Sequence, residues 1–175
     1  MRGRREAAPR AFRGAAALIA AGVLAALAVA PTEAAIVPRE TYVRRADAVC
    51  LDVARKALAL QQEAQRLVAG ADSDAEARQV LVRVYRKQLQ LVRGMRLRIV
   101  GIGTPRGVTA ARVASRLLAG VRAGERALDD VIAAAEGGSL TAFQRAVGRY
   151  RTVSLESARA VRRSGLGFRY CGSGA

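Results

Sequence analysis

The stretch Tyr42–Val68 reads YVRRADAVCLDVARKALALQQEAQRLV, and it decides the expected fold. Small and apolar residues recur in it at alternating spacings of three and four: Val43, Ala46, Cys50, Val53, Ala57, Leu60, Ala64 and Leu67. This spacing is typical of a helix that packs one face against other helices. Cys50 lies on that face, and the only other cysteine, Cys171, lies close to the C-terminus. The stretch therefore predicts a packed helix that carries one of two cysteines.

Three further segments repeat the same spacing. Ser73 and Glu76 match a capping box at the start of the second segment, and Ser139 is a suitable N-cap for the last. Glycines and Pro105 interrupt the pattern between the segments. The expected helices cover about 40–69, 74–102, 107–136 and 140–164. Four helices of similar length with short links predict an all-α, up-down-up-down four-helix bundle over residues 35–175.

The N-terminus has the pattern of a secretory signal peptide, residues 1–34. Five arginines in residues 1–13 precede an uncharged apolar run, Gly14–Ala30. Cleavage after Ala34 is favoured, because cleavage after Ala30 would leave Pro31 next to the cut. The alternative is a membrane anchor formed by residues 14–30. Seventeen apolar residues, mostly alanine, span only about 25 Å, less than the roughly 30 Å of a bilayer core. A secreted or extracytoplasmic location is therefore expected.

Export changes the expected state of the two cysteines. Outside the cytoplasm an even pair is expected to be oxidised, with buried reduced thiols as the alternative. In an up-down-up-down bundle the end of the last helix lies beside the start of the first. The residues after Gly165 could then bring Cys171 to Cys50. We expect a Cys50–Cys171 disulfide with a structural role.

The sequence lacks the residues and spacings of common catalytic and metal sites. Histidine is absent, which removes the commonest general base and zinc ligand. The adjacent pair Asp129-Asp130 would point about 100° apart on a helix and cannot act as facing carboxylates. Residues 101–107, GIGTPRG, lack the spacing and the lysine of a phosphate-binding loop. We therefore expect no enzyme, and no catalytic, cofactor-binding or metal residues.

Charge is the most informative property for function. The formal net charge is +16, and no acidic residue lies between Glu76 and Glu125. This charge favours anionic partners, although arginine can also serve only to solvate helix faces. Few aromatics accompany the basic residues, so nucleic acid is a less expected partner than anionic lipid or acidic wall polymer. The candidate contacts with an anionic surface are Arg83, Arg86, Lys87, Arg93, Arg96, Arg98 and Arg106.

Two segments together resemble a group of known proteins. Tyr42–Cys50 reads YVRRADAVC, and Ala158–Gly172 reads ARAVRRSGLGFRYCG. An aromatic-x-x-x-Ala-Asp-x-x-Cys start and a late Gly-Leu…Cys-Gly resemble small exported helical proteins of GC-rich actinobacteria with paired cysteines and unknown function. The tail here is slightly longer than the usual Gly-Leu-x-x-Cys. The resemblance implies paired cysteines and brings no catalytic residues.

Two functions remain open at this stage. The first is an exported, non-enzymatic helical protein with an interaction or structural role at the cell envelope, its basic face toward anionic lipid or wall polymer. The alternative is a carrier that holds a small apolar ligand within the bundle, where small residues such as Ala114 and Gly124 could leave space. A core pocket of roughly 300 Å³ or more would favour the carrier. The sequence identifies no protein partner.

Overall fold

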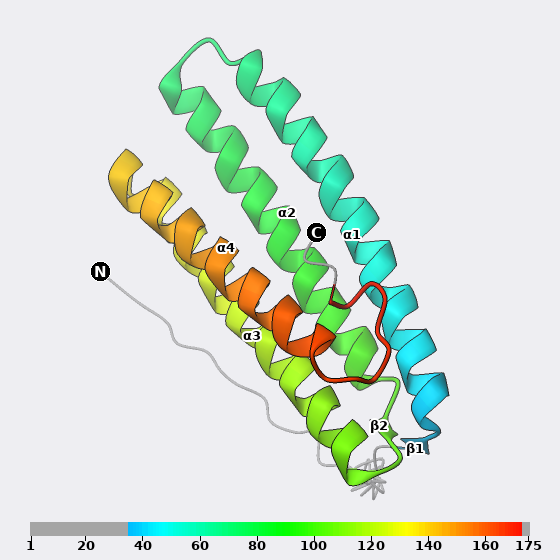
Figure 1. Ribbon diagram of the computed structural model, residues 1–175. Coiled ribbons are helices and arrows are strands. Elements are labelled where there is room, and N and C mark those ends of the chain that lie inside the picture. Colours follow the sequence, from blue (N-terminus) through cyan, green and yellow to red (C-terminus); the bar gives the residue numbers. More distant parts are fainter. Residues whose placement is uncertain (1–34, 173–175) are drawn as a thin grey trace, which may run out of the picture. The chain divides into compact units, whose positions relative to one another are not determined.

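The computed structural model describes residues 35–172, so the expected signal segment, residues 1–34, lies outside the described residues. The described part is all-α with four long helices in chain order (Figure 1). They are α1 (Arg39–Ala69), α2 (Asp74–Val100), α3 (Val108–Glu136) and α4 (Leu140–Arg162). The prediction of a four-helix fold is confirmed.

Local capping fixes where the helices begin. The hydroxyl of Ser73 accepts a hydrogen bond from the backbone N–H of Glu76 at 3.2 Å, and the Glu76 carboxylate accepts one from the N–H of Asp72 at 2.9 Å. Ser139 accepts from the N–H of Ala142 at 3.3 Å. These bonds satisfy N–H groups that have no partner within the helix. Both helix starts were therefore readable from the sequence.

The helix ends differ slightly from the expectation. α2 and α4 each end two residues early, at Val100 and Arg162. The predicted end of α2 at residue 102 was wrong, because the chain leaves the helix after Val100 and enters a short β-bridge. Strand β1 (Ile36–Val37) pairs in parallel with β2 (Thr104–Pro105). The sequence predicted an all-α fold, with no strand in either segment.

Gly103 makes the β-bridge possible. Its φ angle is 98°, and a Cβ built there would lie 2.1 Å from the carbonyl oxygen of Ala35. That same carbonyl accepts a hydrogen bond from the N–H of Thr104 at 2.9 Å. Glycine is therefore required both for the backbone conformation and for the close approach. The bridge ties the chain before α1 to the link between α2 and α3.

The helices pack in the order of the chain. α1 packs on α2, α2 on α3, and α3 on α4, whereas α1 and α4 make little direct contact among the described residues. Figure 1 shows the C-terminal tail, residues 163–172, between α4 and the first half of α1. The bundle is thus closed along three helix pairs, and the tail bridges the fourth.

Alanine, valine and leucine build most of the core. The largest cluster joins α1, the end of α2, the start of α3 and the tail, and it contains Tyr42, Ile99 and Phe168. A second cluster, around Leu128, lies between α2 and α3. The third is small and consists of Leu60, Val80 and Val84 with their neighbours. The end of the bundle that holds the tail therefore contains the largest cluster.

Candidate functional site

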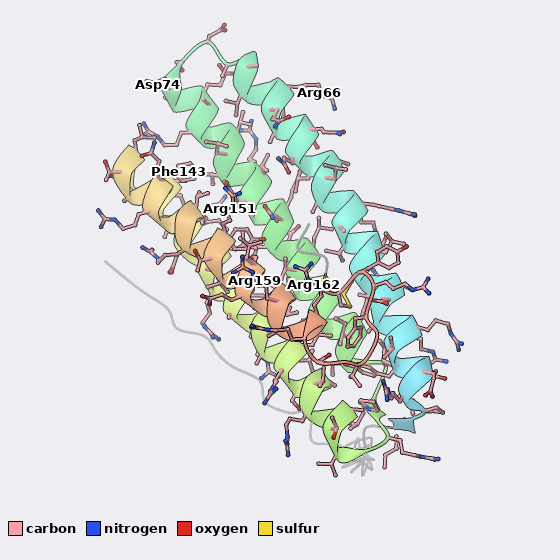
Figure 2. All side chains as sticks on the ribbon, in the orientation of Figure 1. Arg66, Asp74, Phe143, Arg151, Arg159 and Arg162 are labelled. Carbon is pink, nitrogen blue, oxygen red and sulfur yellow. A yellow bond between two sulfur atoms is a disulfide. The ribbon has the colours of Figure 1, made fainter. Side chains whose placement is uncertain are left out.

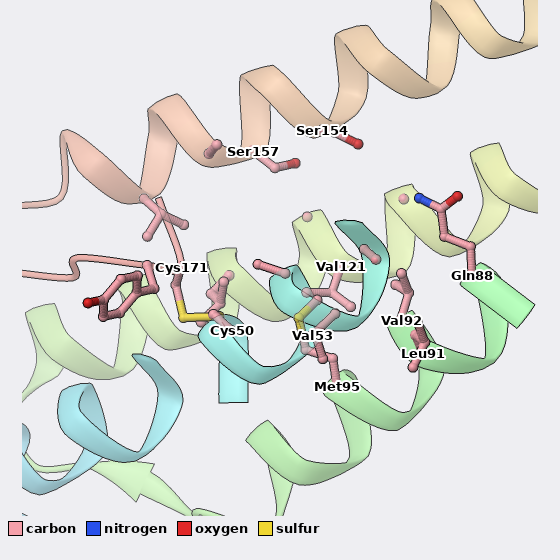
Figure 3. A pocket seen from close by; sticks show the side chains of 18 of the residues that line it. Cys50, Val53, Gln88, Leu91, Val92, Met95, Val121, Ser154, Ser157 and Cys171 are labelled. Carbon is pink, nitrogen blue, oxygen red and sulfur yellow. A yellow bond between two sulfur atoms is a disulfide. The ribbon is translucent and has the colours of Figure 1, made fainter. Parts of the chain in front are cut away.

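The tail is fixed to α1 by a disulfide between Cys50 and Cys171, with an S–S distance of 2.11 Å and 121 residues of sequence separation. The predicted pairing is present. Cys50 lies three turns into α1, on the face that the spacing identified. Both sulfurs lie at the margin of an apolar pocket (Figure 3).

Asp47 provides a second attachment, which the sequence analysis missed. Its carboxylate is buried and accepts three backbone hydrogen bonds from the tail, from the N–H groups of Arg169 (2.8 Å), Tyr170 (2.9 Å) and Cys171 (3.0 Å). Three successive N–H groups that converge on one carboxylate compensate for the loss of its hydration. The Ala46-Asp47 pair in the Tyr42–Cys50 motif was the available signal, but only the folded tail reveals its role.

Aromatic packing completes this end of the fold. The ring of Tyr42 meets that of Phe168 edge-on, with the centroids 6.5 Å apart. Tyr42 is 1% exposed, and its hydroxyl has no hydrogen-bond partner within residues 35–172. Burial without a partner raises the pKa of Tyr42 to about 12. We call this assembly of Tyr42, Asp47, Cys50, Phe168 and Cys171 the tail lock.

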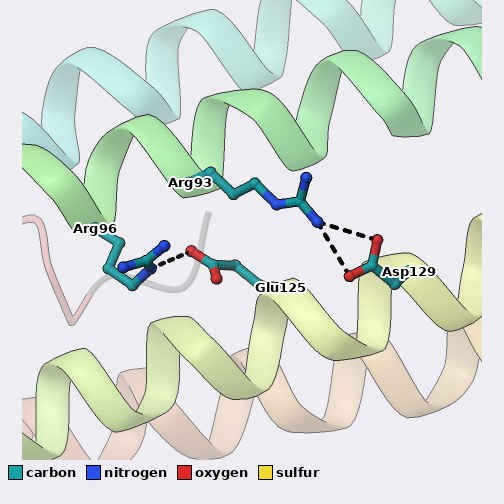
Figure 4. Close-up of polar contacts among 4 residues, drawn as sticks. All are labelled: Arg93, Arg96, Glu125 and Asp129. Atoms are coloured by element: carbon teal, nitrogen blue, oxygen red, sulfur yellow. Dashed lines mark hydrogen bonds and ion pairs between the residues drawn. The ribbon is translucent and has the colours of Figure 1, made fainter.

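Of the seven predicted basic contacts, six lie on α2 and Arg106 lies in the link to α3. Five of the seven form ion pairs, and all five partners come from α1 or from the second half of α3. Figure 4 shows two of these pairs, Arg93–Asp129 (3.3 Å) and Arg96–Glu125 (2.7 Å). The others are Arg86–Glu136, Lys87–Glu63 and Arg98–Asp52. Arg83 and Arg106 have no ion-pair partner among the described residues.

These ion pairs reduce the net charge that α2 presents to a partner. Hydrogen bonds from Arg98 and, to a smaller extent, from Lys56 to the Asp52 carboxylate lower the pKa of Asp52. Exposed pairs of this kind each contribute only about 0–1 kcal/mol to stability, but they place negative charge beside positive charge. An acid-free stretch of sequence is therefore not an acid-free surface. The predicted contacts on α2 stay a prediction, with their charge largely matched by neighbouring helices.

On α4 and the tail, arginines greatly outnumber carboxylates. Residues 140–172 contain seven arginines and a single acidic residue, Glu156. Of the seven, Arg149 is near a carboxylate, 3.9 Å from Asp130, and the other six have no ion-pair partner in the described part of the chain. Figure 2 labels three of the six along α4, namely Arg151, Arg159 and Arg162.

An apolar groove follows the gap that α1 and α4 leave between them. All four helices and the tail line it, and none of its lining residues is charged. Figure 3 shows Val53 and Met95 facing Ser154 and Ser157 across it, with the disulfide at one end and Gln88 at the other. We call it the α1/α4 groove. Its cavity volume is about 190 Å³, below the roughly 300 Å³ at which drug-sized pockets begin.

Polar groups lie at the end of the α1/α4 groove away from the disulfide. The amide of Gln88 donates a hydrogen bond to the hydroxyl of Tyr150 at 3.0 Å. Burial raises the pKa of the Tyr150 phenol, and hydrogen bonds with Ser154 and Gln88 partly oppose this shift. The group is therefore neutral at physiological pH. The groove combines apolar walls with uncharged hydrogen-bonding groups.

Comparison with known proteins yields no relative. No protein-family model, curated protein or solved structure matches the chain.

Residues 35–172 contain no cluster of three or more His, Cys, Asp or Glu side chains placed to hold a metal ion. No helix of this range has the length and hydropathy needed to span a bilayer. The alternative anchor, residues 14–30, lies outside the described residues.

Proposed function

We propose that this is an exported, non-enzymatic helical protein with an interaction role at the cell envelope, where its basic surface adsorbs to anionic lipid or acidic wall polymer. The observation that carries the proposal is the charge of α4 and the tail. Six of their seven arginines lack an ion-pair partner among the described residues. Clustered cations attract polyanions and anionic membranes by screened, long-range forces.

Two other features support the location. The disulfide is consistent with an oxidising, extracytoplasmic compartment. The basic and then apolar N-terminal sequence has the pattern of an export signal. The mass of the protein recovered from outside the cell, with and without reductant, tests cleavage after Ala34 and the disulfide together. Recovery of the full-length chain from the cytoplasm with two free thiols would contradict this location.

Nucleic acid is a weaker candidate because the basic surface lacks stacking groups. Four of the six described aromatic rings are occupied by one another in two edge-on pairs, Tyr42–Phe168 and Tyr85–Phe143, and Tyr150 lies in the α1/α4 groove. Tyr170 is the exposed aromatic of the described residues. Single-stranded nucleic acids are usually bound by several exposed rings within a basic groove.

The test is co-sedimentation of the purified, oxidised protein with anionic vesicles, neutral vesicles and isolated wall material. We expect binding to anionic vesicles or wall material at about 20 mM salt and loss of that binding at about 500 mM, because added salt shortens the screening length. No binding at the lower salt concentration would refute the proposal.

Two charge variants compare the basic residues of α4 and the tail with those of α2. Replacing Arg145, Arg151, Arg159 and Arg163 by glutamine should weaken adsorption more than replacing Arg83, Arg86, Lys87 and Arg93. Both variants remove four charges, but three residues of the second set are already paired with carboxylates. Equal losses would show that only net charge matters.

A further inference from the structure

We infer that the α1/α4 groove binds the alkyl chain of a single-chain anionic amphiphile, a lipid whose carboxylate or phosphate headgroup pairs with an arginine of the α4 rim, Arg151 or Arg162. The inference deepens the proposed function and rests on it, in that the anionic partner is a lipid. It names one ligand class and one site in place of general adsorption.

Small residues create the space in the groove. Ala54, Ala57 and Gly124 line it, and a Cβ built at Gly124 meets no atom within 4 Å. Gly120 has a different role, because a Cβ there would lie 2.7 Å from the hydroxyl oxygen of Ser157. Gly120 therefore allows α4 to approach α3 closely, whereas Gly124 leaves room for a ligand.

The size of the cavity selects the shape of the ligand. A protein cavity of about 150 Å³ is sufficient for benzene, so about 190 Å³ accepts a slender apolar group. It is too small for a polycyclic or drug-sized molecule. Because α1 and α4 make little direct contact among the described residues, an unbranched chain can enter between them with its end in the cavity.

The rim of the groove selects the headgroup. Arg151 lies one turn before Ser154 on α4, and Arg162 lies one turn after Ala158, so both are beside the lining face of the helix. Ser157, on the other edge of that face, touches α3. The two arginines therefore border the side away from α3. The stem of Arg162 also lies against Gly172 in the tail.

The opposite rim, on α1, is apolar. Leu58 follows Ala54 by one turn and is 57% exposed. One rim carries an exposed leucine, and the other carries two arginines without an ion-pair partner among the described residues. This arrangement matches an amphiphile whose chain lies over α1 and whose headgroup faces α4. A membrane surface alone needs the arginines but gives no role to a recessed, uncharged groove.

Calorimetric titration of the purified, oxidised protein with octanoate, decanoate, decyl phosphate and decanol tests the inference. Decanoate should bind about fifteenfold more tightly than octanoate, because each buried methylene contributes about fourfold. Decyl phosphate should bind like decanoate, and decanol at least about tenfold more weakly, because it lacks the charge. Equal affinity for decanol and decanoate would overturn the assignment of an anionic headgroup.

Variants test the site itself. Gly124→Leu fills the groove and should weaken decanoate binding at least about tenfold. Gly148→Leu is the matched control, since Gly148 is also helical, has no atom near a built Cβ and does not line the groove. Ala57→Leu fills the same groove from the α1 side. Thermal unfolding verifies that each variant is folded. Decanoate binding unchanged in both blocking variants would refute the groove as the site.

A second pair of variants tests the arginines. Arg151→Gln with Arg162→Gln should weaken the binding of decanoate but not of decanol. Arg112→Gln with Arg116→Gln removes two α3 charges that have no ion-pair partner within residues 35–172, and it should change neither affinity. A loss in the α3 variant equal to that in the α4 variant would overturn the role of the rim.

Vesicle adsorption separates this inference from the proposed function. Gly124→Leu should still adsorb to anionic vesicles, because it changes no charge. Decanoate binding by a protein that adsorbs neither to anionic vesicles nor to wall material would refute the proposed function and leave the groove inference standing. Adsorption by a protein that does not bind decanoate would refute the groove inference and leave the proposed function standing.

Discussion

The two ends of the α1–α2 pair are stabilised very differently. At one end the tail lock holds α1 by a disulfide, three hydrogen bonds to Asp47 and the buried ring of Tyr42. At the other end, residues 57–85, α1 contacts α2 through the small cluster of Leu60, Val80 and Val84. Leu58 and Leu67 are exposed there. We call this second region the free end.

The difference shows how a chain with few aromatics distributes stability. Four-helix bundles usually bury the first helix against both the second and the fourth. Here α1 has α2 as its main helical neighbour, and covalent and polar links from the tail replace the missing contact. That replacement leaves the α1/α4 groove open. Amide hydrogen exchange should therefore be slowest at the tail lock and fastest at the free end.

The largest expected loss follows from removal of the disulfide. A cross-link over 121 residues stabilises a fold by about 5 kcal/mol in the chain-entropy model. The double variant Cys50→Ala with Cys171→Ala should lose stability of that order, as measured by urea unfolding. Reduction of the unmodified protein is the control, because it keeps both side-chain volumes. A change below about 1 kcal/mol in both experiments would show that the tail lock does not depend on the covalent bond.

Asp47→Ala should produce the second largest effect. It leaves three tail N–H groups without an acceptor, at an expected cost of about 3 kcal/mol. Exchange protection should be lost first at residues 169–171, with the free end unchanged. Asp52→Ala is the matched control on the same helix, because the Asp52 carboxylate pairs with the side chains of Lys56 and Arg98 and with no tail N–H group among the described residues. Equal destabilisation by the two variants would contradict the role assigned to Asp47.

Tyr42 makes the tail lock sensitive to alkaline pH. Its pKa is about 12 in the folded protein against an ordinary value of 10.0. Above pH 10 the unfolded chain binds fewer protons than the folded one, so stability falls as pH rises from 10 to 12, by up to about 3 kcal/mol. Tyr42→Phe should remove this dependence, and at neutral pH it should stabilise by about 1 kcal/mol, because the buried hydroxyl has no partner among the described residues.

Urea unfolding of both proteins between pH 9 and 12 provides the measurement. Identical pH profiles would mean that Tyr42 ionises as readily in the fold as in the unfolded chain.

The smallest expected effect is at the free end. Ser73→Ala removes the N-cap of α2 and should cost about 1 kcal/mol, with faster exchange confined to the first turn of α2 and the preceding link. Ser115→Ala, at an exposed position in the middle of α3, is the control and should be neutral or slightly stabilising. Faster exchange at the tail lock in Ser73→Ala would show that the two ends are not independent.

Local patterns determined most of the secondary structure. Apolar spacing, the Ser73 and Ser139 caps and the glycine breaks predicted four helices within two residues of their observed bounds. They also placed Cys50 on the inner face, from which the pairing with Cys171 followed. These features depend on residues at most four apart or on the helix count, so a single sequence contains them.

The candidate site depended on tertiary structure. Which carboxylates lie beside Arg93 and Arg96 is decided by the packing of α3 on α2, across sequence separations of 36 and 29 residues. The three N–H groups that Asp47 binds come from a tail more than 120 residues away. The groove exists because α4 packs on α3 and makes little direct contact with α1. No periodicity in the sequence encodes this arrangement. Sequence alone determined the helices and their inner faces, and the fold decided which charges are paired and where the groove lies.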